Sequence, residues 1–253
     1  MPFCTNCGTR LEVQSSFCVG CGRSLGIATR KLAAVGPAVA AAPAPEPLDY
    51  TIQGENLQVV RIRLKPGQEV FAEAGKMVYK FPEVQWEGQG NANGSPSLAR
   101  FYATSPSEVG FAGTSPGRVQ AFHLKEGQSM LVGYEGFLCA QSTARLDVAP
   151  IAKPGGERHT LKRLTGPGTM FIHAGGDFLE FVLNPGQAIQ VEPSAIVAFD
   201  DSVSYTMETA PPGGEGPFLA TMTGPGRVVM QSMTAGKVRR AAFEHDAVPA
   251  MSL

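Results

Sequence analysis

The chain has 253 residues, 43% of them hydrophobic and 17% charged, with a formal net charge of −1. This near-neutral balance excludes nucleic-acid binding through overall charge. The 30 glycines and 20 prolines predict many turns and short strands, which favours an all-β fold over long helices. The opening MPFCTNCG lacks the basic start and apolar run of a signal peptide, so we expect a cytoplasmic protein.

The first element is a cluster of four cysteines in the motifs CTNC and CVGC, formed by Cys4, Cys7, Cys18 and Cys21. Each CxxC unit can place two thiolates on one metal, and two units complete a tetrahedral site that suits Zn²⁺. All four ligands come from the protein, so no position stays open for a catalytic water. We therefore predict one structural Zn²⁺ per chain. Two disulfides are the alternative, but nothing in the sequence indicates an oxidising compartment.

Residues 1–25 resemble the short zinc ribbons found at the ends of many prokaryotic proteins. Through Arg30, three arginines outnumber one glutamate, and a Zn²⁺ with four thiolates contributes two negative charges. The ribbon is then roughly neutral, whereas phosphate binding requires a positive surplus. A role in docking a protein or in folding is therefore favoured over nucleic-acid binding.

Residues 26–48 are dominated by Ala and Pro and predict a semi-rigid linker, because each proline fixes φ and biases the preceding residue toward an extended conformation. The apolar segment 32–42 is too short to span a bilayer and contains Pro37, so no transmembrane segment is expected.

Residues 49–235 contain two recurring turn signals. The first is LKPGQ, LKEGQ and LNPGQ, whose glycines Gly67, Gly127 and Gly186 are 60 and 59 residues apart. Proline presets φ and glycine accepts a positive φ, which suits a type II turn. The flanking residues alternate between apolar and polar, so each turn predicts a hairpin. The second signal is TSPGRV at 114–119, TGPGTM at 165–170 and TGPGRV at 223–228.

The order of the two signals predicts a closed domain of three-fold internal repetition. The first repeat lacks its second signal and the last repeat lacks its first. The simplest inference is that the strand near Leu57–Leu64 lies beside the strand near Arg227–Ser232, which completes a third unit. Closure would also remove exposed sheet edges.

Four stretches resemble the AIM24 family: EVFAEAGKMVYK at 69–80, TGPGTMFIHAGG at 165–176, LNPGQAIQVEPSAIVAFDDSV at 183–203 and GPGRVVMQS at 224–232. The resemblance covers roughly residues 50–235. It implies an all-β fold of repeated β-sandwich units like that of the tryptophan RNA-binding attenuator protein (TRAP-like), and a tendency to form homo-oligomers. It supplies no catalytic residues.

The β-repeat region offers few candidates for chemistry. His123 and His173 lie at offsets from their turns that differ by one residue, so their side chains should point to opposite faces and not share a metal. His159 lies in KPGGERH, which predicts a loop. Cys139, in the apolar stretch GFLCAQ, is expected to be a core thiol.

Other polar and aromatic candidates also have structural interpretations. Adjacent Asp200 and Asp201 should face opposite ways and form a solvated turn rather than a carboxylate pair. The single tryptophan, Trp86, is expected to pack on the domain edge, although a ligand contact is an alternative. The tail, residues 236–253, predicts a short helix with a small basic cluster.

We therefore expect a non-enzymatic scaffold that binds partner proteins, with copies of itself among the candidates. The alternative is a module that binds a ligand or RNA in a groove between repeats; fold analogy alone does not transfer RNA binding.

Overall fold

The computed structural model describes residues 7–9, 21, 45–89, 98–133, 135–152, 158–211 and 217–243. The chain divides into two compact units, Met1–Pro43 and Ala44–Leu253. In its described part, the second unit holds nineteen β-strands, one 3-10 turn, η1 (Pro193–Ala195), and one α-helix, α1 (Ala235–Phe243). The all-β class predicted from the sequence is confirmed, and so is a short helix near the end of the chain.

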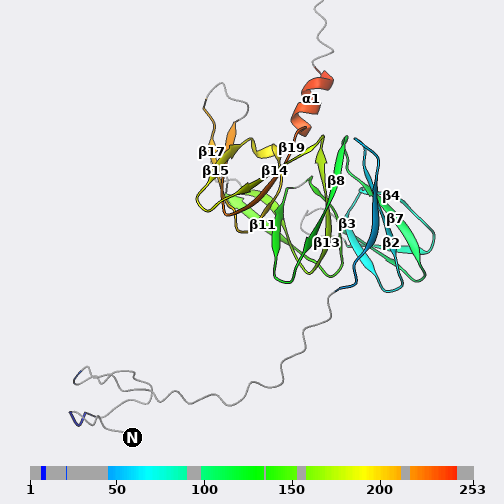
Figure 1. The fold of residues 1–253 in the computed structure, drawn as a ribbon, viewed down its shortest axis with the longest axis horizontal. Coiled ribbons are helices and arrows are strands. Elements are labelled where there is room, and N and C mark those ends of the chain that lie inside the picture. Colours follow the sequence, from blue (N-terminus) through cyan, green and yellow to red (C-terminus); the bar gives the residue numbers. More distant parts are fainter. Residues whose placement is uncertain are drawn as a thin grey trace, which may run out of the picture. The chain divides into compact units, whose positions relative to one another are not determined.

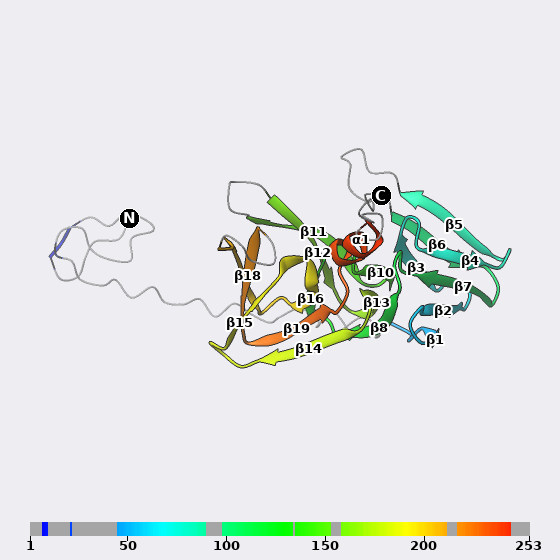
Figure 2. The same cartoon turned by 90° about the horizontal axis from the view of Figure 1, so that it is seen from above.

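The strands of the second unit form four sheets that follow one another from one end of the unit to the other (Figures 1 and 2). The first sheet has the order β1 (Asp49–Gln53), β2 (Val59–Leu64), β7 (Ser107–Ala112), β4 (Met77–Lys80). The second has the order β5 (Val84–Gln89), β6 (Leu98–Ala103), β3 (Glu69–Glu73), β10 (Phe137–Gln141), β13 (Gly168–Gly175), β8 (Gly117–Leu124).

The other two sheets continue the stack. The third has the order β11 (Arg145–Ala152), β12 (Arg158–Thr165), β9 (Ser129–Val132), β16 (Ile196–Asp200), β19 (Gly226–Gln231), β14 (Phe178–Leu183). The fourth has the order β15 (Ala188–Val191), β18 (Phe218–Thr223), β17 (Ser204–Thr209). All strand pairs within these sheets are antiparallel, as expected for sandwiches in which sheets pack face to face.

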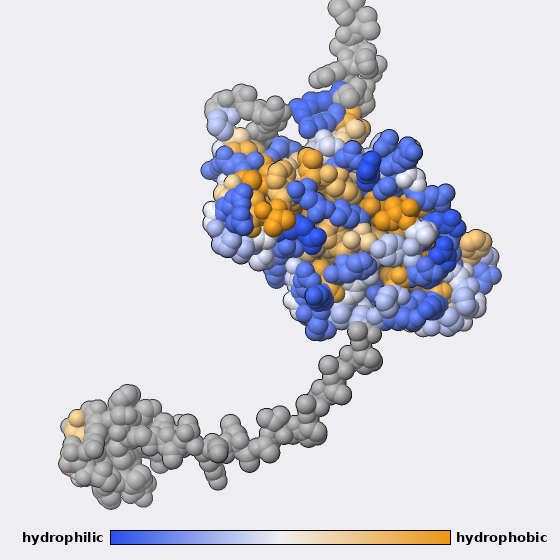
Figure 3. All heavy atoms as spheres, viewed as in Figure 1, coloured by the Kyte–Doolittle hydropathy of each residue, from blue (hydrophilic) through white to orange (hydrophobic). Residues whose placement is uncertain are grey.

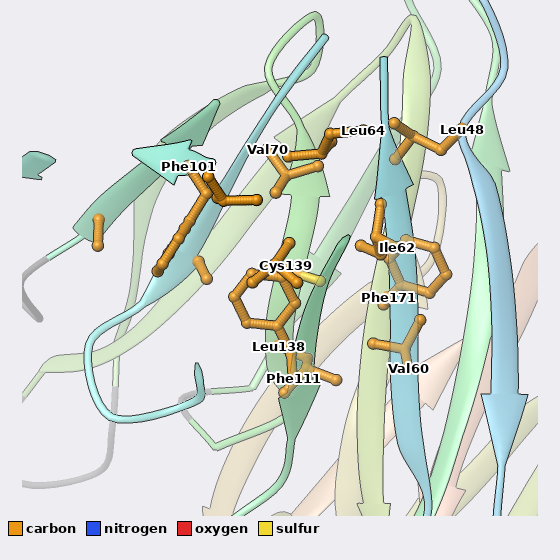
Figure 4. Packing of buried hydrophobic residues seen from close by; sticks show 14 of the residues in the cluster. Leu48, Val60, Ile62, Leu64, Val70, Phe101, Phe111, Leu138, Cys139 and Phe171 are labelled. Atoms are coloured by element: carbon orange, nitrogen blue, oxygen red, sulfur yellow. The ribbon is translucent and has the colours of Figure 1, made fainter. Parts of the chain in front are cut away.

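Three hydrophobic clusters hold the four sheets together, one between each neighbouring pair. In the first cluster, Val60, Ile62 and Leu64 of β2 point toward Val70 and Phe171 of the second sheet (Figure 4). These alternate residues of β2 are at most 1% exposed. The alternation read from the sequence thus marks the buried face of the strand.

The three LxPGQ-type turns have the predicted local geometry. Gly67, Gly127 and Gly186 have φ of 83°, 72° and 78°, as a type II turn requires. In each turn the glutamine closes the loop twice. Its backbone N–H donates to the carbonyl three residues earlier at 2.9–3.0 Å, and its side-chain oxygen accepts from that same residue's N–H at 3.0–3.2 Å.

The prediction that these turns form hairpins is wrong. The strands on either side of each turn lie in different sheets: β2 and β3, β8 and β9, and β14 and β15. Each turn therefore carries the chain across a core into the next sheet. Both flanking strands have an apolar face, and these faces are buried against each other in the core between the two sheets.

Two of the three occurrences of the second turn signal lie at equivalent places in the fold, as predicted, and the third does not. Gly166-Pro167 and Gly224-Pro225 are both cis peptide bonds, and they lead into β13 and β19. By contrast, the TSPG stretch at 114–117 links β7 of the first sheet to β8 of the second. The turns at 165–168 and 223–226 precede β13 and β19, the sixth strands of their six-strand segments. The equivalent turn in the first segment precedes β7 and is Thr104–Ser107.

The predicted closure of the domain is also wrong. β2 pairs with β1 and β7 in the first sheet, whereas β19 pairs with β14 and β16 in the third sheet. Both edges of each strand are therefore used by other strands. The unit is an open stack whose first and last sheets lie at opposite ends (Figure 2).

The same order of pairing occurs in three consecutive segments of six strands: Val59–Ala112, Gly117–Gly175 and Phe178–Gln231. In each segment the sixth strand pairs with the first and third, and the fifth pairs with the second and fourth. Each third strand has a register shift against the sixth, at Met77/Tyr79, Phe137/Cys139 and Ile196/Ala198.

Neighbouring segments are connected by two pairings, β3 with β10 and β9 with β16, which we call the segment joints. In each joint, the second strand of one segment pairs with the third strand of the next.

Candidate functional site

The predicted zinc ligands lie only partly within the described residues. Cys7 and Cys21 are described and exposed, and the Cys7 Sγ lies 3.2 Å from the Thr9 Oγ1. Cys4 and Cys18 fall outside the described residues. The four-thiolate zinc site therefore stays a prediction.

The histidines do not come together. His123 and His173 lie on the paired strands β8 and β13, but the partner of His173 is Val119, four residues from His123. His173 is buried against Gly113 and Gly117, where an added Cβ would meet its ring at 2.3 and 2.8 Å. His159 lies within β12, so the loop interpretation is wrong. Among the described residues, no group of three or more His, Cys, Asp or Glu side chains is arranged to hold a metal.

The remaining candidates have structural environments. Cys139 is fully buried, as predicted, and burial raises the pKa of its thiol well above the ordinary value. Asp200 accepts a hydrogen bond from the Arg227 backbone N–H at 2.8 Å, while Asp201 forms an ion pair with Arg163 at 2.9 Å. The two carboxylates thus have separate partners and do not act as a pair. Trp86 is exposed on β5, an edge strand of the second sheet.

Sequence reasoning missed a buried ion pair at the junction of the first two segments. The Lys162 Nζ lies 2.5 Å from the Glu73 Oε1, and both side chains are buried. Burial lowers the pKa of Lys162, and the hydrogen bond to Glu73 partly opposes this shift. Burial also lowers the pKa of His173, with a further contribution from nearby Lys76. The partners are 89 residues apart, and nothing in the stretch LKRLT distinguishes the buried Lys162 from the less buried Arg163 beside it.

A cavity of about 350 Å³ lies under α1, beside the third and fourth sheets. The rings of Phe199 and Tyr205 stack in its wall, with centroids 5.7 Å apart and an interplanar angle of 10°. Burial raises the pKa of Tyr205 to about 12, so the phenol is neutral at physiological pH. Glu135 and Arg239 supply opposite charges to the lining. The volume falls in the range of small-molecule sites.

A larger groove, of about 950 Å³, lies between β14, β15 and α1; its lining includes Leu179, Gln190, Glu192, Met230, Lys237 and Arg240. Beside it, β14 is an edge strand with unusually exposed apolar side chains: Leu179 is 46%, Phe181 43% and Val182 76% exposed. Figure 3 shows such apolar patches, in orange, among the polar residues of one face of the domain. Exposed apolar groups of this kind mark interaction surfaces.

None of the described helices is both long enough and apolar enough to cross a membrane.

Comparisons with known proteins agree with the fold. The chain is similar to a Streptococcus pyogenes protein of known crystal structure, with 20% identity and a TM-score of 0.68, over 78% of this chain and 99% of that one. No curated protein sequence matches the chain. Residues 50–233 match the family model "Mitochondrial biogenesis AIM24", so the chain belongs to the AIM24 family.

Proposed function

We propose that the protein is a non-enzymatic, cytoplasmic scaffold that binds other proteins. The observation that carries this proposal is the apolar surface of β14, an edge strand with three exposed apolar side chains. An edge of this kind is a template for pairing with another chain, and soluble proteins normally blunt it with charge, proline or a cover. β14 has one charged residue, Glu180.

The N-terminal part of the proposal is a ribbon in which Cys4, Cys7, Cys18 and Cys21 hold one structural Zn²⁺. A four-thiolate set fits this metal, and binding would supply the folding energy that so small a module cannot gain from its core. The ribbon would present a second docking surface, connected to the β domain through the linker, residues 26–48.

The architectural part of the proposal is a TRAP-like domain made of three copies of one six-strand unit. The shared order of strand pairing and the three glutamine-closed turns support it. Stacked units contact only their neighbours, so the two end units carry surfaces that no unit of the same chain covers. Such ends suit a scaffold.

Metal analysis tests the ribbon in the full chain. We expect one zinc per chain in the wild type, and loss of that zinc in a Cys18→Ser/Cys21→Ser variant that keeps the β domain folded. A Cys139→Ser variant is the control and should keep the metal. Zinc that persists after both ribbon cysteines are replaced would contradict the structural site.

Affinity capture from the native cell tests the scaffold. We expect Phe181→Glu to lose a partner that a control variant, Val148→Glu, retains, because Val148 is exposed on a different edge strand, β11. The ribbon variant should lose a different partner if the ribbon docks one. Identical captured proteins from all variants would contradict the proposal.

The alternative function is binding of a small ligand or RNA, favoured by the cavity beneath α1. Its stacked Phe199 and Tyr205 rings suit a planar apolar group, and Arg239 suits an anion. Native mass spectrometry of the purified protein should then show a bound mass that Leu161→Trp, which fills the cavity, removes. RNA that co-purifies and dissociates with salt would favour RNA binding instead.

A further inference from the structure

Two strand edges at opposite ends of the stack correspond to the two halves of a segment joint. In the described part of the chain, β15 pairs only with β18, and β4 pairs only with β7. β15 is the second strand of the last segment, and β4 is the third strand of the first. Within the chain, strands in these two positions pair with each other twice, as β3 with β10 and as β9 with β16.

We propose that β15 of one copy pairs with β4 of a second copy, so that the segment joint is made a third time between chains. This inference rests on the proposed function and deepens it: it names a second copy of this chain as the protein that covers β14, and it does not require the ribbon. It identifies the occupant of the groove along β15 as the first sheet of another copy.

The internal joints define the register. Cys139 and Ala140 lie opposite Ala72 and Phe71 in one joint. Ala198 and Phe199 lie opposite Val132 and Leu131 in the other. The third strands share a register shift, so Tyr79 of β4 corresponds to Cys139 of β10 and Ala198 of β16. The register of the internal joints then places Tyr79 of one copy opposite Val191 of the other, and Lys80 opposite Gln190. The third strands all carry this shift at the same position against the sixth strand of their segment.

The apolar face of β14 supports the same partner. Two residues before the leucine of each LxPGQ-type turn, the first strands carry Ile62, Phe122 and Phe181, with exposures of 0%, 3% and 43%. A following segment lies over the first two; for example, the Arg227 guanidinium of the third segment lies 4.7 Å from the Phe122 ring centre. The third segment has no successor among the described residues. A second copy's first segment would take that place and cover Phe181.

On the surface that the second copy would present, the charged side chains of β2 and β7 are already paired: Arg61 and Arg63 both form ion pairs with Glu108. On β7 and β4 of the first sheet, the Tyr79 hydroxyl donates to Glu108 at 2.6 Å, and Arg61 pairs with Glu108 at 2.8 Å. The Tyr79 ring lies flat against Gly110, where a Cβ would clash with it at 2.2 Å. This arrangement offers an aromatic ring and a neutralised carboxylate to Phe181.

Charge and apolar contacts at the pairing strands are also complementary. Lys80 would lie beside Gln190, whose side chain donates to Glu208 at 3.1 Å. The β4 region adds the exposed side chains Met77, Val78 and Phe81. Because the two surfaces differ, the association is heterologous, and each copy keeps one free half of a joint until a ring closes.

Cross-linking tests the register in the full chain. We would mix a Lys80→Cys protein with a Gln190→Cys protein under mild oxidation, digest the mixture, and search by mass spectrometry for peptides joined through positions 80 and 190. The matched control mixes Lys80→Cys with Glu126→Cys, a position exposed on the turn of the middle segment. We expect the first link and not the second. Equal yields of the two links, or a link only in the control mixture, would overturn the proposal.

Light scattering after gel filtration tests the association itself. At micromolar concentration we expect a mass of two or more chains for the wild type. Val78→Lys should shift it to one chain, because an edge lysine opposes strand pairing. Val148→Lys is the matched control: the two valines are 57% and 58% exposed, both on edge strands. A monomeric wild type, or an oligomer that survives Val78→Lys, would overturn the proposal.

Discussion

Ile62 and Phe181 occupy the same place in two first strands, each two residues before the leucine of an LxPGQ-type turn. Ile62 is fully buried, whereas Phe181 is 43% exposed. Their local sequences are alike, and both turns have a glycine with positive φ and a closing glutamine. The difference arises later in the chain, because a further segment covers β2 and no described segment covers β14. Position in the stack, rather than local pattern, decides which apolar residues are available for binding.

The largest effect should come from the buried charges at the junction of the first two segments. Replacing Glu73 by Gln leaves the buried Lys162 ammonium without its carboxylate, which costs about 3–5 kcal/mol in the free energy of unfolding. Urea denaturation measures this loss. The double variant Glu73→Leu/Lys162→Met should recover most of it. If Glu73→Gln lowers the free energy of unfolding by no more than the loss of a solvent-exposed ion pair does, then water reaches this ion pair and the junction does not exclude it.

The second effect compares Ile62 and Phe181 directly. Ile62→Ala should lower the free energy of unfolding by about 2–5 kcal/mol, since it empties space in the first hydrophobic cluster. Phe181→Ala should cost the monomer well under half as much, because its ring is only partly covered. Both are measured by urea denaturation at a concentration where the chain is monomeric. Equal losses would mean that β14 is covered in solution.

A smaller effect should come from the turn glutamines. Gln187→Ala removes one side-chain hydrogen bond to the backbone, from the Asn184 N–H, worth about 1 kcal/mol. Gln68→Ala removes two, one from the Lys65 N–H and one to the Pro47 carbonyl. Gln68 is buried while Gln187 is exposed, so the loss for Gln68→Ala should be the larger. Thermal unfolding of the two variants measures which substitution lowers the stability more. A larger loss for Gln187→Ala would show that burial does not determine how much these glutamines contribute to stability.

The smallest effect concerns the outer face of the first sheet. Burial raises the pKa of Glu108, but hydrogen bonds from Tyr79 and Arg61 outweigh it, and the net pKa lies below the ordinary 4.5. Its contribution to stability is therefore present above pH 4.5 and is lost as the pH falls through the folded pKa. We expect this contribution to the free energy of unfolding to be under about 1 kcal/mol. In Glu108→Gln the free energy of unfolding should therefore fall less steeply with decreasing pH below pH 4.5 than in the wild type. The same pH dependence in both proteins would contradict this prediction.

Much of the local structure could be predicted from the sequence. The glycines and prolines predicted the turns, and Gly67, Gly127 and Gly186 have the expected positive φ. Alternation of apolar residues identified the buried face of β2, and the apolar setting of Cys139 identified a core thiol. These features depend on φ preference and on two-residue periodicity, which act over a few neighbouring residues. The match of residues 50–233 to the AIM24 family agrees with the resemblance seen in the sequence.

Only the tertiary structure decided which strands become partners. The same turn can connect two strands that pair in one sheet, or two strands that lie in different sheets on either side of a core. The sequence near the turn does not distinguish these arrangements. At all three turns the chain crosses the core into the next sheet. The sequence therefore could not show that β2 and β19 lie apart, that Glu73 meets Lys162 across 89 residues, or that β4 and β15 each have an edge that no described strand pairs with. These outcomes depend on packing between distant segments.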